Sequence, residues 1–426
     1  MRAKKSIYSF QNLLEMLGKI FKYIFVLLIC MAACDSKPKK SRVIHKILQN
    51  SKDSIIKHVL SDSSPYEVQI LLTRIERDSM GKPSFEKYDF QLNTKQYFYP
   101  ASTVKLPVAI IALKKIRKLQ SQGVQITSET PFEIVHQGKL LKKNDSTHPQ
   151  NKLTIAHLIK KIFLVSDNTA YNYLFDFVGR DQINEAIHEV GINDFKLFHK
   201  FSDSDNMNIN PRFIFYDSKG DTVYNQNPIV STQKLNNKHL KGILKGKGYI
   251  KDGKTIRQPM DFSEKNHASI TALNQILERI IFPKLFNKKE QFKITQEDHY
   301  FLRYWMSRVP TEVDVPFYDR ETYFDSYCKF FIYGDQKGLM TNKTRVFNKI
   351  GMAYGTTTDV AYIKDDQGIE FFLSATILTN KNGIFNDDQY EYDQLGVPFL
   401  AALGREMYEF EKNQQRAKWF KATLKN

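Results

Sequence analysis

The sequence predicts an α+β fold, in which an antiparallel sheet flanked by terminal helices carries an all-helical lobe. Strand-like segments lie near both ends of the 426-residue chain, and helix-like segments fill its middle. Strands from both ends can join one sheet only if the helical middle projects from it, so a cleft is expected where the two parts meet. Apolar residues make up 42% of the chain, which is enough for a sizeable core.

The first predicted elements of the folded domain are a helix and a hairpin. Apolar residues recur at helical spacing through 43–60, which predicts one amphipathic helix. Residues 66–75 (YEVQILLTRI) are strand-like, and aromatic and polar residues alternate through 85–92. A turn with Gly81 and Pro83 separates these two segments, so they are predicted to pair.

The middle of the chain, about 99–340, is predicted to form the helical lobe. Gly191 is suited to end one of its helices and Thr295 to cap the start of another. Residues 207–263 fit least well, because they are rich in Asn, Lys and Gly. They predict a surface insertion with a hairpin at 212–224, whose role as decoration, cleft lining or partner docking stays open. The predicted helices of the lobe are 102–119, 153–165, 170–178, 182–190, 270–281 and 296–306.

The C-terminal part returns to strands. Residues 346–352, 358–365 and 370–379 are rich in β-branched and aromatic residues, which favours strands. An amphipathic helix is expected at 394–412. The predicted domain therefore covers 43–412, and a basic tail follows at 413–426.

The N-terminus indicates export. A short apolar run, 24–29, lies behind Lys19 and Lys22 and leads through small residues to Cys34, which is typical of a secretory signal. The run is too short to span a bilayer. A Cys after two alanines resembles the lipobox of bacterial lipoproteins. That resemblance implies a signal peptide over 1–34, a lipid on the sulfur of Cys34, and a periplasmic or outer-membrane protein of the cell envelope.

Residues 35–42 (DSKPKKSR) would then form a polar tether between the lipid and the domain. A plain signal peptide with an incidental Cys34 is the alternative. The net charge of +17 has no zinc-ligand or RNA-binding signature beside it, so nucleic acid is not an expected partner. The ten histidines show no ligand spacing, so neither a metal nor another cofactor is expected. We expect a monomer.

The first chemical candidate is Ser102-Thr103-Val104-Lys105 at the start of a predicted helix. A serine hydroxyl is a weak nucleophile that needs a base. Residues three apart share a helix face, so the Lys105 amine can reach Ser102. A partly desolvated lysine near other cations can be neutral near pH 7. The Ser-x-x-Lys pattern alone is weak evidence for a catalytic site, because it also occurs at Ser54 and elsewhere.

Two further triplets follow in the sequence. Ser166-Asp167-Asn168 lies between two predicted helices, where Ser166 could relay a proton and Asn168 could bind a substrate amide or hold Lys105. A second copy of this triplet, at 204–206, lies in a polar loop and ranks lower.

The third triplet is Lys349-Ile350-Gly351, at the start of a predicted strand. Lys349 could bind a substrate carboxylate, and Gly351 would let the backbone approach a ligand closely. The N–H groups of Met352 and Ser102 could form an oxyanion hole.

In this order Ser-x-x-Lys, Ser-Asp-Asn and Lys-x-Gly resemble the motifs of class A β-lactamases and their penicillin-binding relatives. Three longer segments carry the same resemblance: YPASTVKLPVAI, LTIAHLIKKIFLVSDNTAYNYLF and NKIGMAYGTTTDVAYI. The resemblance implies a β-lactamase/transpeptidase-like fold. It also implies that Ser102 is acylated, that Lys105 is its base or base partner, that Ser166 relays protons and that Lys349 anchors a carboxylate.

Two positions depart from that family. Its third triplet has Thr or Ser in the middle, whereas Ile350 offers no hydroxyl. Class A enzymes also carry a Glu that activates the deacylating water. Ser202 stands where that Glu is expected, so Asp203 or Asp205 would have to replace it.

Three functions remain open from the sequence. The first is a serine hydrolase that opens a β-lactam or related amide through an acyl-Ser102 intermediate. The second is a D,D-peptidase-like or esterase-like enzyme acting on an amide derived from the cell wall. The third is a non-catalytic module that keeps the penicillin-binding fold.

Overall fold

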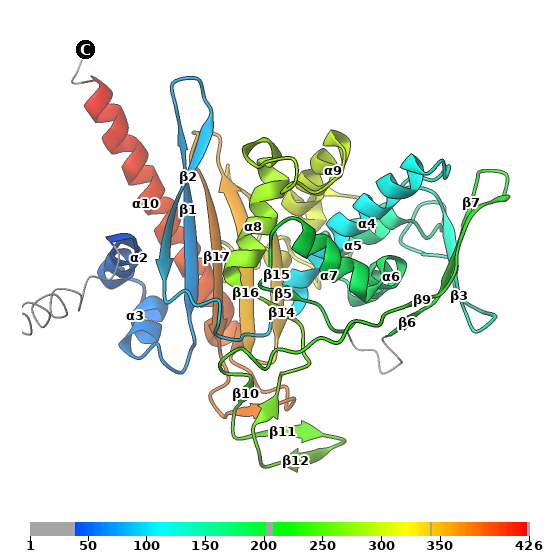
Figure 1. The fold of residues 1–426 in the computed structure, drawn as a ribbon. Coiled ribbons are helices and arrows are strands. Elements are labelled where there is room, and N and C mark those ends of the chain that lie inside the picture. Colours follow the sequence, from blue (N-terminus) through cyan, green and yellow to red (C-terminus); the bar gives the residue numbers. More distant parts are fainter. Residues whose placement is uncertain (1–38, 202–207, 341–342, 424–426) are drawn as a thin grey trace, which may run out of the picture.

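A computed structural model of the chain describes residues 39–201, 208–340 and 343–423 (Figure 1). Cys34 and the predicted signal, as well as Asp203, Asp205 and the second Ser-Asp-Asn triplet, lie outside these residues. Within the described ranges, no helix is long and apolar enough to cross a membrane.

A five-stranded antiparallel sheet joins the two ends of the chain, as the sequence predicts. Its order is β15-β16-β17-β1-β2. Strand β1 therefore pairs on one side with β17, which comes from the C-terminal part of the chain. Residues of β16 and β17 are buried almost without interruption, because both faces of the sheet are covered. The strands are β1 Gln69–Arg77, β2 Pro83–Phe90, β15 Arg345–Ala353, β16 Thr356–Lys364 and β17 Glu370–Leu378.

The terminal helices cover one face of this sheet (Figure 1). They are α2 Lys39–Asn50, α3 Ser54–Ser61 and α10 Val397–Thr423. The prediction of one helix through 43–60 was wrong, because Asp53 starts a new helix by accepting hydrogen bonds from the N–H groups of Ile55 and Ile56.

Two predicted boundaries at the ends of the domain were also wrong. Helix α2 begins at Lys39, inside the predicted tether 35–42. Helix α10 continues to Thr423, through most of the predicted tail 413–426, and a π-helical turn at Tyr392–Gly396 precedes it. Good helix formers such as Gln, Arg, Ala and Lys fill this extension, so an amphipathic pattern is not needed for the backbone to remain helical.

The helical lobe packs on the other face of the sheet (Figure 1). Helix α4 occupies its centre and is buried along most of its length. Thr295 caps α9 through a reciprocal pair of hydrogen bonds with Asp298, as its position predicted. The helices are α4 Lys105–Ser121, α5 Ile155–Leu164, α6 Asn168–Val178, α7 Arg180–Glu189, α8 Ile270–Ile281 and α9 Gln296–Ser307.

The lobe is not all-helical, in contrast to the prediction. A four-stranded sheet of order β4-β3-β7-β8 lies at its outer edge. Strand β7 belongs to the predicted insertion, and its Phe213 and Phe215 are fully buried against Phe132 of β3. The predicted hairpin at 212–224 is therefore present but anchored to the lobe. The strands are β3 Phe132–His136, β4 Lys139–Lys142, β7 Arg212–Tyr216 and β8 Thr222–Gln226.

Candidate active site

Ser102 lies in a short 3₁₀ turn, Ala101–Val104, that leads directly into helix α4. The residue before it, Ala101, has a positive φ of 46°, a conformation that is uncommon for a residue other than glycine. This turn holds the half-buried Ser102 at the start of α4, as the sequence predicts. Lys105 is the first residue of the helix and is fully buried.

The amine of Lys105 lies among polar atoms of the second triplet. Its Nζ donates to Asn168 Oδ1 at 2.7 Å, to Ser166 Oγ at 3.2 Å and to the backbone carbonyl of Ser166. Asp167 caps helix α6 by accepting from the Ala170 N–H at 2.7 Å, so it fixes the local turn. Ser166 has a positive φ of 58°, and this turn presents both its carbonyl and its hydroxyl to Lys105.

Lys349 reaches the same hydroxyl from the sheet. Its Nζ donates to Ser166 Oγ at 2.8 Å and to the carbonyl of Ile350 at 2.9 Å. Ser166 therefore lies between two lysine amines that come from different layers of the fold. The structure brings together side chains that are 183 residues apart in the sequence.

Burial sets the charge of the two lysines. Desolvation lowers the pKa of Lys105 well below its ordinary value, and repulsion by Lys349 lowers it further. Desolvation also lowers the pKa of Lys349, to about 8. The direction of the shift favours the neutral form of Lys105, whereas a pKa of about 8 leaves Lys349 largely protonated at neutral pH.

Gly351 lets strand β15 approach the Ser102 turn. A Cβ atom at Gly351 would lie 2.6 Å from the carbonyl oxygen of Pro100 and 3.0 Å from the backbone nitrogen of Ser102. Such contacts are too close for any side chain, so glycine is required here by the packing. The next residue, Met352, is partly exposed and lines the same cavities as Ser102.

Two cavities meet at Ser102. The larger, of about 1420 Å³, extends past Asn168 toward the insertion, and the smaller, of about 400 Å³, extends past Ser166. Ser102, Asn168 and Met352 line both of them. The predicted cleft between the sheet and the lobe therefore contains two cavities that adjoin at Ser102.

The structure describes the first of the two departures from the family motifs, at Ile350, but not the second. Ile350 lines the smaller cavity and gives it an apolar wall. The nearby threonines do not replace the missing hydroxyl, since Thr358 bonds to Thr376 at 2.8 Å and Thr356–Thr358 line neither cavity. The suggested deacylating residues, Asp203 and Asp205, belong to the part of the chain that the structure does not describe.

A buried polar network behind Lys349 was not predicted. Lys329 Nζ donates to Asn348 Oδ1 at 2.8 Å, and Asn348 Nδ2 donates to Asp359 Oδ1 at 2.8 Å. Burial raises the pKa of Asp359 to about 6 and lowers that of Lys329 to about 8. The signal available in the sequence was an Asn and an Asp, Asn348 and Asp359, inside two segments that are predicted to be strands.

A sequence model of the β-lactamase enzyme family matches residues 54–296, more than half of the chain. A solved β-lactamase from Desulfarculus baarsii is 14% identical, with a TM-score of 0.48 over 88% of this chain and 98% of that one. A class A representative from Bacteroides cellulosilyticus is also 14% identical, with a TM-score of 0.47 over 88% and 98%.

A third solved structure, the TLA-3 extended-spectrum β-lactamase, has 14% identity and a TM-score of 0.46 over 84% of this chain and 97% of that one. No curated protein matches the sequence. The family match covers the Ser102 turn, helix α4 and the Ser166 triplet. The chain belongs to the β-lactamase enzyme family, as a serine hydrolase of that type.

Proposed function

We propose that this protein transfers acyl groups from β-lactam rings or related amides to Ser102 and then to water. The observation that carries the proposal is the buried pair of lysines joined by Ser166 Oγ, at 3.2 Å from Lys105 and 2.8 Å from Lys349, together with the smaller cavity that Ser166 lines beside Ser102. A neutral and a charged amine on one hydroxyl form a path along which a proton can move.

In the acylation step, Ser102 Oγ attacks the carbonyl carbon and a C–O bond forms. The hydroxyl proton passes to the neutral amine of Lys105. When the tetrahedral intermediate collapses, the C–N bond breaks, and the leaving nitrogen takes a proton from Ser166 Oγ, which recovers one from Lys105. The backbone N–H groups of Ser102 and Met352 are proposed to stabilise the oxyanion. Asn168 holds Lys105 and is proposed to bind the substrate amide.

Two chromogenic or fluorescent substrates test the proposal. Incubation with a chromogenic cephalosporin should give turnover, and intact-mass measurement with a fluorescent penicillin should give one adduct that maps to Ser102. A stable adduct without turnover would favour the D,D-peptidase-like alternative. Absence of both adduct and turnover, with Ser102→Ala behaving like the wild type on cell-wall fragments, would favour a non-catalytic module.

Deacylation is proposed to depend on Asp203 or Asp205. The substitutions Asp203→Asn and Asp205→Asn should be made separately. The variant that removes the activating carboxylate should still acylate but accumulate the adduct, because only the second step needs that group. Unchanged turnover in both variants would assign water activation to another residue.

We also propose that Cys34 carries a lipid and holds the domain at a membrane of the cell envelope. Its sequence context supports this, as a short apolar run ends in small residues before Cys34. Expression with a radiolabelled fatty acid should label the wild type and leave Cys34→Ser unlabelled. Equal labelling of both would contradict the proposal.

A further inference from the structure

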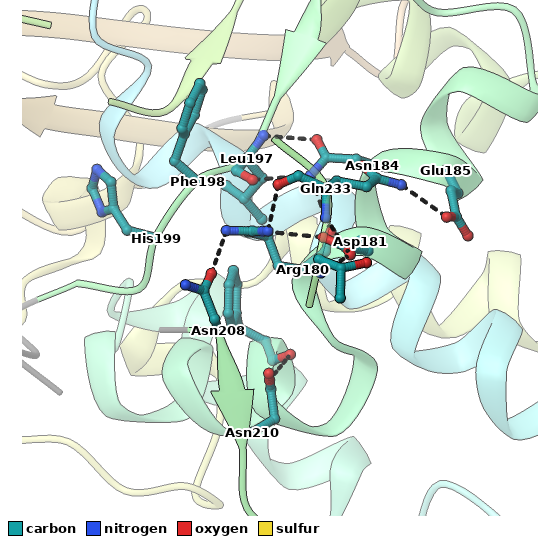
Figure 2. Close-up of polar contacts among 12 residues, drawn as sticks. Arg180, Asp181, Asn184, Glu185, Leu197, Phe198, His199, Asn208, Asn210 and Gln233 are labelled. Carbon is teal, nitrogen blue, oxygen red and sulfur yellow. Dashed lines mark hydrogen bonds and ion pairs between the residues drawn. The ribbon is translucent and has the colours of Figure 1, made fainter. Parts of the chain in front are cut away.

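Two polar networks border the cavities, and they differ in how they hold charge. At the larger cavity, Arg180 donates to Asn208 Oδ1 at 2.6 Å and to the carbonyl of Gln233 at 2.7 Å (Figure 2). Asp181 accepts from the backbone N–H groups of Thr232 at 2.5 Å and Gln233 at 2.9 Å. These bonds tie the insertion to helix α7, and both charged side chains are partly exposed, so water screens them.

The network behind Lys349 instead keeps full charges away from water. Lys329 is 1%, Asn348 2% and Asp359 0% exposed. The Asn348 amide bridges the two charged groups, since it accepts from Lys329 Nζ at 2.8 Å and donates to the Asp359 oxygens at 2.8 and 3.0 Å. With pKa values of about 8 and about 6, Lys329 and Asp359 are both largely charged at neutral pH.

The network also anchors a wall of the smaller cavity. Asn348 Nδ2 donates to the carbonyl of Cys328 at 2.9 Å, and Asp359 Oδ2 accepts from the Phe331 N–H at 3.2 Å. These bonds fix the segment that carries Phe330, which lines the cavity. Anchoring of this kind needs hydrogen-bonding groups but no net charge, because a neutral amide accepts from an N–H as a carboxylate does.

Burial of the two charges therefore calls for another explanation. Removal of a carboxylate and an ammonium from water costs free energy, and a neutral set of the same shape often gives an equally stable core. A charge kept in a dry interior acts strongly on other charges nearby, because water does not screen it. The charged group of the site that is next in the chain to Asn348 is Lys349.

Lys349 extends from the other face of the same strand. Side chains alternate between the faces of a strand, so Asn348 and Lys349 point in opposite directions from β15. Ile350 shares the Asn348 face and packs in the core beneath the terminal helices, whereas Lys349 Nζ reaches Ser166 on the lobe side. In the register of β15 and β16, Asp359 pairs with Ile350, so its carboxylate lies across the buried sheet from Lys349.

The other ionisable groups around Lys349 do not supply a buried negative charge. Lys105 faces it from α4 and repels it, and burial raises the pKa of the Cys328 thiol, which is therefore neutral. Asp359 favours the charged form of Lys349, while Lys329 and Lys349 repel each other. The remaining charged groups around the smaller cavity are at least partly exposed to water, which screens them: Asp167, Asp335, Lys337 and Asp393.

We propose that Asp359 and Lys329 are positioning residues that control the protonation of Lys349 from the far face of the sheet. The carboxylate favours the charged amine that the proposed acylation requires, and the Lys329 ammonium opposes it. Asn348 holds the two charges at a fixed spacing. The inference rests on the proposed function, because the charge of Lys349 matters to the reaction only if Ser102 is acylated.

Substitutions that change one charge at a time test this control through the pH profile of acylation by a fluorescent penicillin. Asp359→Asn should move the alkaline fall of the rate to lower pH by about one unit, because loss of the anion disfavours the ammonium form of Lys349. Lys329→Gln should move it to higher pH by about half a unit, because a repelling charge is lost. The double variant should lie between the two single variants.

Asp365→Asn is the matched control. Asp365 lies beyond the far end of β16, about 20 Å from Asp359, and should keep the wild-type profile. A merely structural role would slow acylation without moving the alkaline fall in opposite directions. An unmoved fall in Asp359→Asn, or shifts of the same sign in both single variants, would overturn the inference.

Direct titration of the Lys349 amine separates this inference from the proposed function. Its NMR signal in protein made with isotopically labelled lysine, assigned by its absence in Lys349→Arg, reports protonation without any substrate. If the wild type is not acylated but the amine titrates with the expected shifts, the proposed function fails and the electrostatic control stands. If acylation occurs and the amine titrates identically in the wild type and Asp359→Asn, the control fails and the function stands.

Discussion

The two cavities that meet at Ser102 are built by different means. The smaller is walled by side chains of the sheet core, such as Phe330, Ile350 and Val397, which are each less than a tenth exposed. The larger is walled by irregular segments that a few hydrogen bonds hold, among them those of Asp181 and Asn237. The smaller cavity is therefore bounded by close packing that tolerates little change, whereas the larger one is bounded by segments that can vary without loss of the fold.

The largest effect of a substitution is expected at Ser102, which lines both cavities. Ser102→Ala should lower the acylation rate by about 10⁴-fold or more, because no other group can form the ester bond. Intact-mass measurement with a fluorescent penicillin gives the result. Ser54→Ala is the matched control, since Ser54 also precedes a Lys by three residues but is exposed on α3. Labelling of Ser102→Ala at the wild-type rate would place the nucleophile elsewhere.

The pH profile of acylation tests the two lysines at the smaller cavity. The proposed acylation needs Lys105 without its proton and Lys349 with its proton. The lowered pKa of Lys105 favours the first condition, and Lys349, with a pKa of about 8, loses its proton as the pH rises above that value. The rate should fall about tenfold between about pH 7 and 9.

Lys349→Arg serves as the companion variant for that profile. Arginine stays charged, so the alkaline fall should move to higher pH even if the rate at neutral pH is lower. A wild-type rate that keeps rising above pH 8 would contradict the assigned roles.

Gly351→Ala tests the tight packing between β15 and the Ser102 turn. The new Cβ would lie 2.6 Å from the carbonyl oxygen of Pro100, so the turn must shift. We expect a loss of about 1–3 kcal/mol in the free energy of unfolding, together with slower acylation. Gly338→Ala is the control, because a Cβ there meets nothing within 4 Å. Equal stability of the two variants in denaturant titrations would argue against the constraint.

The smallest effect is expected at the wall of the larger cavity. Asp181→Ala removes the acceptor of two backbone N–H groups and should cost about 1 kcal/mol, confined to this region. Faster amide hydrogen exchange over 231–238 would report it. Glu185→Ala, which removes one exposed side-chain bond to Gln233, should change the exchange less. Unchanged exchange in Asp181→Ala would mean that other contacts hold the wall.

Much of the fold could be predicted because its elements have strong local patterns. The apolar spacing in α4 through α9 and the β-branched runs in β15 to β17 gave both the type and the approximate bounds of these elements. The break between α2 and α3 was missed, because the apolar positions continue in phase on both sides of Asp53. The small sheet was missed because β3 and β4 are short and lie between strongly helical segments.

The order of the motifs in the sequence indicated the candidate site, but not which hydrogen bonds its side chains form or which residues wall its cavities. That Ser-x-x-Lys, Ser-Asp-Asn and Lys-x-Gly belong together followed from their order and context. The residues that wall the larger cavity, such as Lys234, had no pattern to mark them, because lysines are frequent throughout a chain with 63 Lys and Arg residues.

The sequence by itself determined most of the helices and strands, and that a serine and two lysines stand in motifs typical of one enzyme family. Only the tertiary structure decided that both lysine amines meet at Ser166 Oγ and lose contact with water. The physical reason is that a pKa depends on burial and on neighbouring charges. Both of these arise from contacts between residues 61 and 183 positions apart, which no local pattern specifies.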